Sequence, residues 1–278
     1  MSIWQAVFFG LVQGLSEFLP ISSSAHLSVL GNLFGVASSG AINYKLFSVF
    51  LHFGTIVSIF IVLWNDIADM IYEILLIVNS KDNPQYKKRH YPNARLLLMM
   101  VISSAPLLLM LLIYKYIDRL YYSTIFIGVS MLLNGCMLFV AGKFSGTKKT
   151  CESMTISDAL ITGFCQTVGA IPGISRIAVT MTGGIAAGLR KDFAVKYAIL
   201  LSIPASFGIN VLHLAEAASA NFAWSDIPLC LVGMAVSLAF GVFSLKLVLS
   251  LGEKAKYRGF AYYCLVAGAL FIILTVIF

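Results

Sequence analysis

The chain has 278 residues, of which 59% are hydrophobic and 11% are charged. A soluble globular domain carries about 25% charged residues, so this composition excludes a water-soluble fold and indicates an integral membrane protein. The net charge of +7 is attributed to basic loops, because no basic patch with interleaved aromatic residues points to nucleic acid. The five cysteines are scattered without a CxxC pair, which argues against a zinc site or a disulfide framework.

The first apolar region, residues 3–35, is interrupted by proline, glycine and serine. Each of its halves has about 12–16 residues, too few to cross a hydrocarbon core of about 30 Å. We therefore predict a re-entrant helix–loop–helix hairpin, whose irregular backbone must be buried by protein or reached by water. The N-terminus lacks the basic region and cleavage site of a signal peptide, so we expect this hairpin to be retained.

Six later segments are long and apolar enough for transmembrane helices, and a short amphipathic helix is expected at 66–78, between the first two. The predicted fold class is therefore an all-α integral membrane protein with about six transmembrane helices and two re-entrant hairpins. The predicted spans are roughly 46–64, 94–114, 121–142, 194–214, 227–248 and 260–278.

Residues 157–189 form a second broken region that resembles the first, and each region is followed by three spans. Because three is an odd number, the second half must be inverted in the membrane. We predict a single membrane domain, 1–278, in which an inverted-topology repeat covers about 1–142 and 157–278, with the functional site at the repeat interface. The matching segments are Ala6–Gln13 with Ala159–Gln166 and, after removal of one residue, Pro20–Ser23 with Pro172–Ser175.

The placement of lysine and arginine predicts the orientation of the chain. Twelve of these residues lie in loops that we assign to the cytoplasm, against three on the opposite side. This bias places the N-terminus and the first hairpin outside and the second hairpin on the cytoplasmic side. The cytoplasmic loops are 79–93, 143–156, 190–193 and 252–258.

Glu17 and Arg176 lie in the breaks of the two hairpins. An ionisable residue at membrane depth is costly and marks a functional site by default; the alternative is a buried ion pair that joins the two repeats. Ser22 and Ser23 precede one predicted helix, and Ser175 precedes the other. Such residues cap helices, but a helix N-terminus also attracts phosphate, and arginine can bind a phosphate through two N–H groups. We therefore predict an anion site where the two breaks converge.

His26 lies three residues after Ser23, close to the same helix start. A lone histidine is more often structural, but with Ser23 and Glu17 it completes a candidate set of nucleophile, base and carboxylate. His52 has no such neighbours in the sequence and is interpreted as a packing or supporting residue. Gln13 precedes Glu17 by four residues and shares its helix face. Their oxygens suit a hard cation such as Mg²⁺ or Ca²⁺.

Two motifs carry a resemblance to a known family. The segment QGLSEFLPISSSAH, from Gln13 to His26, resembles the Glu/Gln-x-x-x-Glu and Ser-Ser-x-x-His region of undecaprenyl-diphosphate phosphatases of the bacitracin-resistance type. The segment PGISRIAVT, from Pro172 to Thr180, resembles their Pro-Gly-x-Ser-Arg-Ser-x-x-Thr motif, with Ile177 in place of the second serine. The likeness covers essentially the whole chain in length, hydropathy and motif spacing.

The resemblance implies hydrolysis of undecaprenyl diphosphate to undecaprenyl phosphate and inorganic phosphate, which recycles the cell-wall lipid carrier and confers bacitracin resistance. It also implies a divalent cation, Mg²⁺ or Ca²⁺, and an outward-facing site in the bacterial plasma membrane; a homodimer is considered as well. By position, Ser23, His26 and Glu17 would be catalytic, Glu17 and Gln13 would hold the metal, and Ser22, Ser175, Arg176 and Thr180 would bind the substrate.

The main alternative function is a flippase for a lipid phosphate, or an anion transporter, because transporters also use inverted repeats and broken helices. The cluster of Ser23, His26 and Glu17 favours chemistry, since a carrier needs no nucleophile–base pair. Ile177 also leaves open an inactive relative that serves as a scaffold. Whether Ser23, His26 or a water molecule attacks phosphorus is left open by the residues.

Overall fold

The computed structural model describes residues 1–36, 44–79, 91–121, 123–144, 148–218, 224–253 and 257–277. Within these ranges the chain is helical, and the one β-type contact is an isolated bridge between Lys149 and Leu189. The helices are α1 Ile3–Phe18, α2 Ser23–Leu33, α3 Tyr44–Val62, α4 Trp64–Asn79, α6 Pro92–Ser104, η1 Ala105–Leu107, α7 Leu108–Leu120, α8 Thr124–Lys143, α9 Ile156–Val168, α10 Arg176–Ala186, α11 Lys191–Ala218, η2 Trp224–Asp226, α12 Ile227–Glu253 and α13 Arg258–Ile277.

Six helical segments in the described part of the chain are long and apolar enough to cross a membrane, which confirms the predicted multi-pass all-α fold. They fall in all six predicted regions, and the second is built from α6, η1 and the start of α7. A 3₁₀ turn interrupts it at Pro106, because proline cannot donate a backbone hydrogen bond. The spans are Tyr44–Val62, Pro92–Met110, Thr124–Lys143, Lys191–Glu216, Trp224–Gly252 and Arg258–Ile277.

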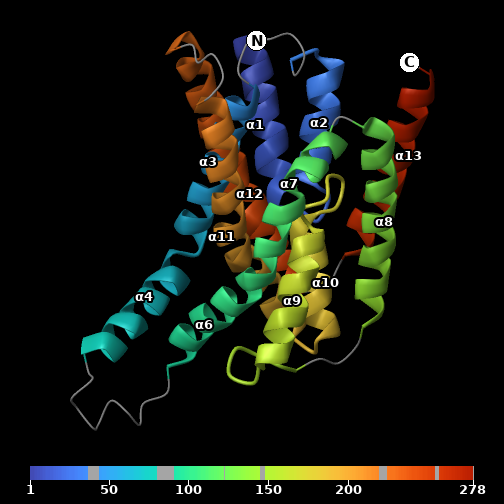
Figure 1. Cartoon of the computed structure of the whole chain (residues 1–278). Coiled ribbons are helices and arrows are strands. Elements are labelled where there is room, and N and C mark those ends of the chain that lie inside the picture. Colours follow the sequence, from blue (N-terminus) through green and yellow to red (C-terminus); the bar gives the residue numbers. More distant parts are fainter. Residues whose placement is uncertain are drawn as a thin grey trace.

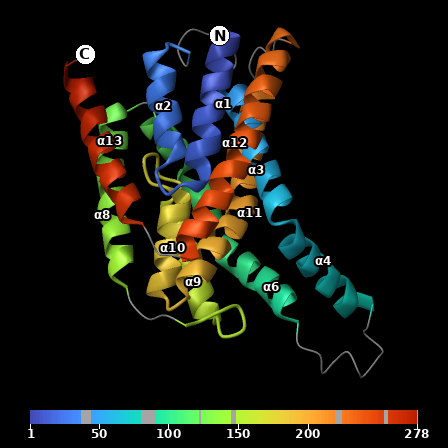
Figure 2. The same cartoon turned by 180° about the vertical axis from the view of Figure 1, so that it is seen from behind.

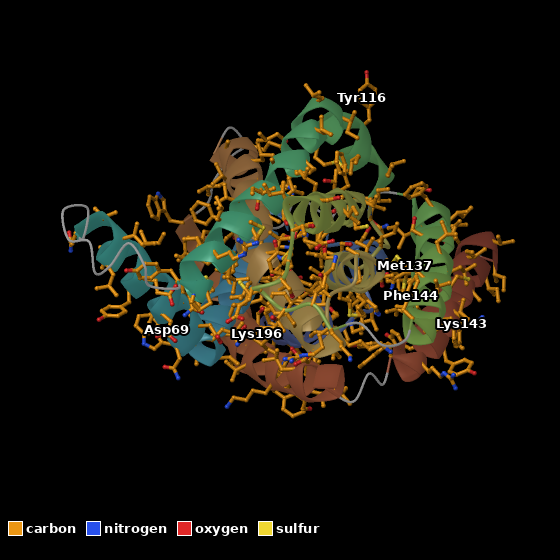
Figure 3. The ribbon with its side chains drawn as sticks, turned by 90° about the horizontal axis from the view of Figure 1, so that it is seen from below. Asp69, Tyr116, Met137, Lys143, Phe144 and Lys196 are labelled. Atoms are coloured by element: carbon orange, nitrogen blue, oxygen red, sulfur yellow. The ribbon has the colours of Figure 1, made fainter. Side chains whose placement is uncertain are left out.

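The two broken regions form helical hairpins at the predicted places. Figures 1 and 2 show α1 and α2 running from one end of the bundle to its middle and back, while α9 and α10 do the same from the opposite end. Seen from below, α9 and α10 lie inside a ring formed by the other helices (Figure 3). The two turns therefore meet in the middle of the molecule. The return of each hairpin to one membrane face, and the inverted repeat, stay predictions.

Glycines let each hairpin pack against a span of the other half of the chain. A Cβ atom on Gly14 of α1 would lie 2.6 Å from the carbonyl oxygen of Ser237 on α12, and one on Gly163 of α9 would collide with the backbone of Ser103 on α6. Contact between backbones at this range needs glycine, as in other membrane helix pairs. Each hairpin is therefore packed closely against a helix from the other half of the chain.

The main core lies on the cytoplasmic side of the predicted orientation, around α10 and α11. Residues Ile177–Ile185 of α10 are buried on all sides of the helix, and so is the α11 segment from Tyr197 to Leu201. A helix that is apolar all round is stable only when its neighbours cover it completely. By contrast, α4 has the one buried residue Met70, in keeping with the amphipathic helix expected at 66–78.

Candidate active site

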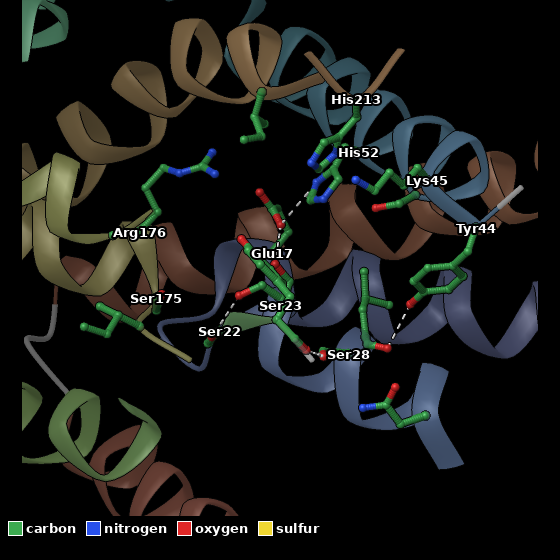
Figure 4. Close-up of a pocket in the computed structure, with 18 residues that line it drawn as sticks. Glu17, Ser22, Ser23, Ser28, Tyr44, Lys45, His52, Ser175, Arg176 and His213 are labelled. Atoms are coloured by element: carbon green, nitrogen blue, oxygen red, sulfur yellow. Dashed lines mark hydrogen bonds and ion pairs between the residues drawn. The ribbon is translucent and has the colours of Figure 1, made fainter. Parts of the chain in front are cut away.

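A pocket of about 280 Å³ lies between the two hairpin turns, where the sequence predicts the functional site. Figure 4 shows its polar side chains converging from α1, α2, α3, α10 and α11. Five predicted site residues line it, namely Glu17, Ser22, Ser23, Ser175 and Arg176, and its further polar and basic lining includes Lys45, His52 and His213.

Ser23 and Glu17 form the most direct contact in the pocket. The Ser23 hydroxyl donates a hydrogen bond of 2.6 Å to Oε2 of Glu17, whose side chain is 13% exposed. Glu17 lies in the last turn of α1, Ser23 begins α2, and the short turn between them brings the two groups together. A carboxylate that already accepts the hydroxyl proton is positioned to act as its general base.

The turn contains an unusual backbone conformation at Ser22. This residue caps α2 with φ at 67°, the one positive φ among the described non-glycine residues. Such a conformation costs about 1–3 kcal/mol, persists only where the surroundings enforce it, and is concentrated at functional sites. Ser22 thus turns the chain so that the Ser23 hydroxyl faces α1.

Gln13 links Glu17 to His52, which the sequence pattern did not identify as a site residue. The Gln13 amide donates to Oε2 of Glu17 at 3.0 Å, and its Nε2 also lies 2.9 Å from Nδ1 of His52 on α3. Since the amide N–H donates, Nδ1 accepts, and a neutral imidazole then carries its proton on Nε2. His52 therefore presents an N–H donor to the pocket. Its position at membrane depth was the signal that could have found it.

Gln13, His26 and Thr180 do not line the pocket, although all three were predicted as site residues. Thr180 is fully buried within α10, and its hydroxyl has no hydrogen-bond partner among the described residues. His26 Nδ1 lies 2.7 Å from the Ser22 carbonyl, and Nε2 lies 2.7 Å from the hydroxyl of Tyr263 on α13. Its ring also stacks on Tyr263 at 5.7 Å between centroids. Ser23 points back to α1 while His26 points to α13, so the expected serine–histidine contact does not form. A catalytic role for His26 stays a prediction.

Arg176 begins α10 and faces the pocket from the side opposite His52 (Figure 4). Its Nη1 donates a 2.6 Å hydrogen bond to the Ser206 hydroxyl on α11, which fixes the guanidinium. The described contacts include no ion pair between Arg176 and Glu17. The guanidinium is therefore aimed at the pocket by a neutral partner, as an anion-binding group requires.

Asn134 on α8 connects the two hairpin turns and was not recognised from the sequence. Its Nδ2 donates to the Pro20 carbonyl at 3.0 Å, and its Oδ1 accepts from the Ser175 backbone N–H at 3.0 Å. The residue is 1% exposed. One buried amide thus sets the distance between the turn that carries Ser23 and the helix start that carries Arg176.

Glu17 and Gln13 are the residues that fit a divalent cation. Gln13 Oε1 is buried without a hydrogen-bond partner among the described residues, and Glu17 supplies a carboxylate beside it. Among the residues that the structure describes, no three or more histidine, cysteine, aspartate or glutamate side chains lie together in an arrangement that could hold a metal ion. This set suits a cation that takes one or two protein oxygens and completes its coordination with phosphate and water, as Mg²⁺ does.

Comparison with known proteins places the chain in a family. The family model described as bacitracin resistance protein BacA matches residues 6–270. A curated relative from Methanosphaera stadtmanae, named undecaprenyl-diphosphatase, is 33% identical over 282 residues, which cover 100% of this chain and 99% of the relative. A relative of the same name from Halothermothrix orenii is 33% identical over 281 residues, covering 100% of both chains. The chain therefore belongs to the bacitracin resistance protein BacA family.

Proposed function

We propose that the protein hydrolyses undecaprenyl diphosphate to undecaprenyl phosphate and inorganic phosphate. The observation that carries the proposal is the 2.6 Å hydrogen bond from Ser23 to Glu17, in a pocket that Arg176 also lines. Relatives that match the whole chain are named undecaprenyl-diphosphatase. This activity would return the lipid carrier to cell-wall synthesis and so counter bacitracin, in keeping with the family description.

In the proposed mechanism Ser23 is the nucleophile and Glu17 is its base. The Ser23 oxygen attacks the terminal phosphorus, its proton passes to Glu17, and the bond between that phosphorus and the bridging oxygen breaks. Undecaprenyl phosphate leaves with that proton, which restores the Glu17 carboxylate, and a phosphoserine remains. Water then attacks the phosphoserine and gives a proton to Glu17, which passes it to the Ser23 oxygen as the bond between phosphorus and that oxygen breaks and inorganic phosphate is released. Direct attack by water, with Glu17 as base, is the alternative.

Donors around the pocket stabilise the charge of the transferring phosphoryl group. Arg176 provides a planar fork of N–H groups, His52 provides its Nε2–H, and the start of α2 provides backbone N–H groups. Most of the catalysis in phosphoryl transfer comes from such positioning and charge neutralisation. Ser175 supports this arrangement by capping α10, since its hydroxyl accepts from the Ala178 N–H at 3.3 Å.

We also propose that Glu17 and Gln13 hold a divalent cation, Mg²⁺ or Ca²⁺, together with the substrate. When bound, the cation would neutralise phosphate charge and polarise the phosphoryl oxygens. Glu17 and Gln13 would hold it through their side-chain oxygens, while Glu17 also accepts the hydrogen bonds of Ser23 and Gln13.

The proposed location is the bacterial plasma membrane, with the pocket open to the outside. The excess of lysine and arginine in the loops assigned to the cytoplasm supports this orientation. The pocket then faces the side where the first hairpin enters. A homodimer stays a prediction, to be checked by the mass of the detergent-solubilised protein.

The test is release of phosphate by the full chain, purified in detergent and supplied with undecaprenyl diphosphate and Mg²⁺ or Ca²⁺. We expect wild-type release that chelation abolishes, and loss of at least about 10²-fold in Ser23→Ala and Arg176→Ala. No release from the wild type would refute the proposal. Movement of the lipid across vesicle bilayers without release of phosphate would instead support a flippase.

A further inference from the structure

A second positively charged side chain, that of Lys45, lies at the other end of the pocket from Arg176. Lys45 is in the first turn of α3 and lines the pocket, and Figure 4 shows it beside His52, on the far side of Glu17 from Arg176. Its Nζ pairs with Oε2 of Glu216 on α11 at 2.6 Å. Glu216 is not among the residues that line the pocket. Lys45 therefore belongs to the pocket, while its partner stands outside it.

The charges of the pocket explain why a second basic side chain would be needed to bind a diphosphate. Among the described lining residues, the carboxylate is Glu17 and the permanent cations are Arg176 and Lys45. Arg176 alone offsets Glu17, whereas a diphosphate ester brings several negative charges on two phosphorus atoms. When the terminal phosphorus of a diphosphate lies at Ser23, its second phosphate must extend to one side of Ser23. Arg176 occupies one side of Ser23 and Lys45 the other.

The pair between Lys45 and Glu216 can be exchanged at little cost. The two side chains are 34% and 38% exposed, and ion pairs at such exposure contribute little to stability. Lys45 also stays near the pocket without Glu216, because its neighbour Tyr44 anchors the start of α3 to α2. The Tyr44 hydroxyl donates to the Leu27 carbonyl at 2.8 Å.

We propose that Lys45 binds the second phosphate of the substrate, the one that carries the prenyl chain, and leaves Glu216 to do so. The proposal rests on the proposed hydrolysis of a prenyl diphosphate. It makes Lys45 a specificity-determining residue, because a ligand with a single phosphate at Ser23 does not reach both cations. Glu216 then competes with the substrate for Lys45.

Two matched variants give different results if the proposal holds. Lys45→Gln should raise KM for undecaprenyl diphosphate by about tenfold, since it loses a charge-assisted hydrogen bond, with kcat within about twofold of the wild type. Glu216→Gln removes the competing charge of Glu216 and should leave KM unchanged or lower it. Lys45→Arg should retain most of the affinity. In competition assays, Lys45→Gln should weaken inhibition by inorganic diphosphate and leave inhibition by inorganic phosphate unchanged.

Different failures separate this proposal from the proposed function. If the wild type releases no phosphate, both are wrong. If the wild type is active and Lys45→Gln and Glu216→Gln raise KM to the same extent, the pair is merely a structural bridge between α3 and α11, and the Lys45 proposal falls while hydrolysis stands. An unchanged KM in Lys45→Gln, in protein that melts at the wild-type temperature, also overturns it.

Discussion

The two hairpins have the same helix–turn–helix form but contribute different chemistry. The first places Glu17 and Ser23 at its turn, whereas the matching positions of the second hold Ala170 and Ser175. The second instead contributes Arg176, fixed by Ser206. The two hairpins thus bring two helix starts together, and the candidate reacting groups and the anion-binding group are divided between them.

The matching glutamines show the same division at a buried position. Gln13 and Gln166 are both 0% exposed. Gln13 contacts Glu17 and His52, whereas neither amide atom of Gln166 has a hydrogen-bond partner among the described residues. An unpartnered buried polar atom costs about 1–3 kcal/mol. Gln13 therefore contacts residues of the candidate site, whereas the amide of Gln166 makes no hydrogen bond to the described residues.

The largest expected effect comes from the turn of the first hairpin. Glu17→Gln keeps the size of the side chain but removes the base, so kcat should fall about 10³-fold with the fold intact. Steady-state phosphate release and thermal melting in detergent measure the two quantities. Ser16→Ala is the control, since the Ser16 hydroxyl bonds to the carbonyl of Val12 in its own helix. A kcat for Glu17→Gln within tenfold of the wild type would rule out Glu17 as the base.

Breaking the link between the hairpins should have the next largest effect. Asn134→Ala removes the contacts with Pro20 and Ser175, and a misplacement of about 1 Å between reacting groups can cost about 10²-fold in rate. We expect kcat to fall by that order while KM changes less. Ser130→Ala, another buried position on α8, should stay within about twofold. A lower melting temperature with unchanged kcat would limit Asn134 to a structural role.

Substituting the two matching glutamines tests the division between the hairpins directly. Gln13→Leu breaks a hydrogen bond to a carboxylate and should lower kcat/KM by about tenfold. It should also raise the cation concentration needed for half-maximal activity. Gln166→Leu loses no described hydrogen bond, so activity should stay within about twofold and the melting temperature should be equal or higher. Equal losses in both variants would contradict a site confined to the first glutamine.

The smallest effect is expected at the far end of the second hairpin, where Lys149 binds Asp158 at 2.9 Å and the Ala187 carbonyl at 3.1 Å. Burial alone would raise the pKa of Asp158, but hydrogen bonds from Thr155 and Lys149 outweigh it and hold that pKa below the usual 3.8. Asp158→Asn should lower stability by about 1 kcal/mol at neutral pH and leave activity unchanged.

The pH dependence of that loss has a definite sign. Because the folded pKa of Asp158 is depressed, its contribution is complete above about 3.8 and disappears as the pH falls through the folded value. Melting curves of the wild type and Asp158→Asn should therefore converge in acid. Asp192→Asn is the matched control, since the Arg190–Asp192 pair is exposed and should contribute little at any pH. Curves that stay apart in acid would show that the charge of Asp158 is not responsible.

The sequence by itself determined the membrane fold, the positions of the two breaks and the residues Glu17, Ser23 and Arg176. These follow from local rules, since apolar length decides whether a helix can span and spacing decides which neighbours share a face. Gln13 and Glu17, four residues apart, accordingly meet as predicted.

Only the tertiary structure decided which distant residues complete the site. His52 meets Gln13 across 39 residues, Asn134 reaches Pro20 across 114, and Lys45 reaches Glu216 across 171. The same packing turned His26 toward Tyr263 and away from Ser23. Such contacts depend on how helices cross and rotate against each other, and the pattern of one helix does not contain that information.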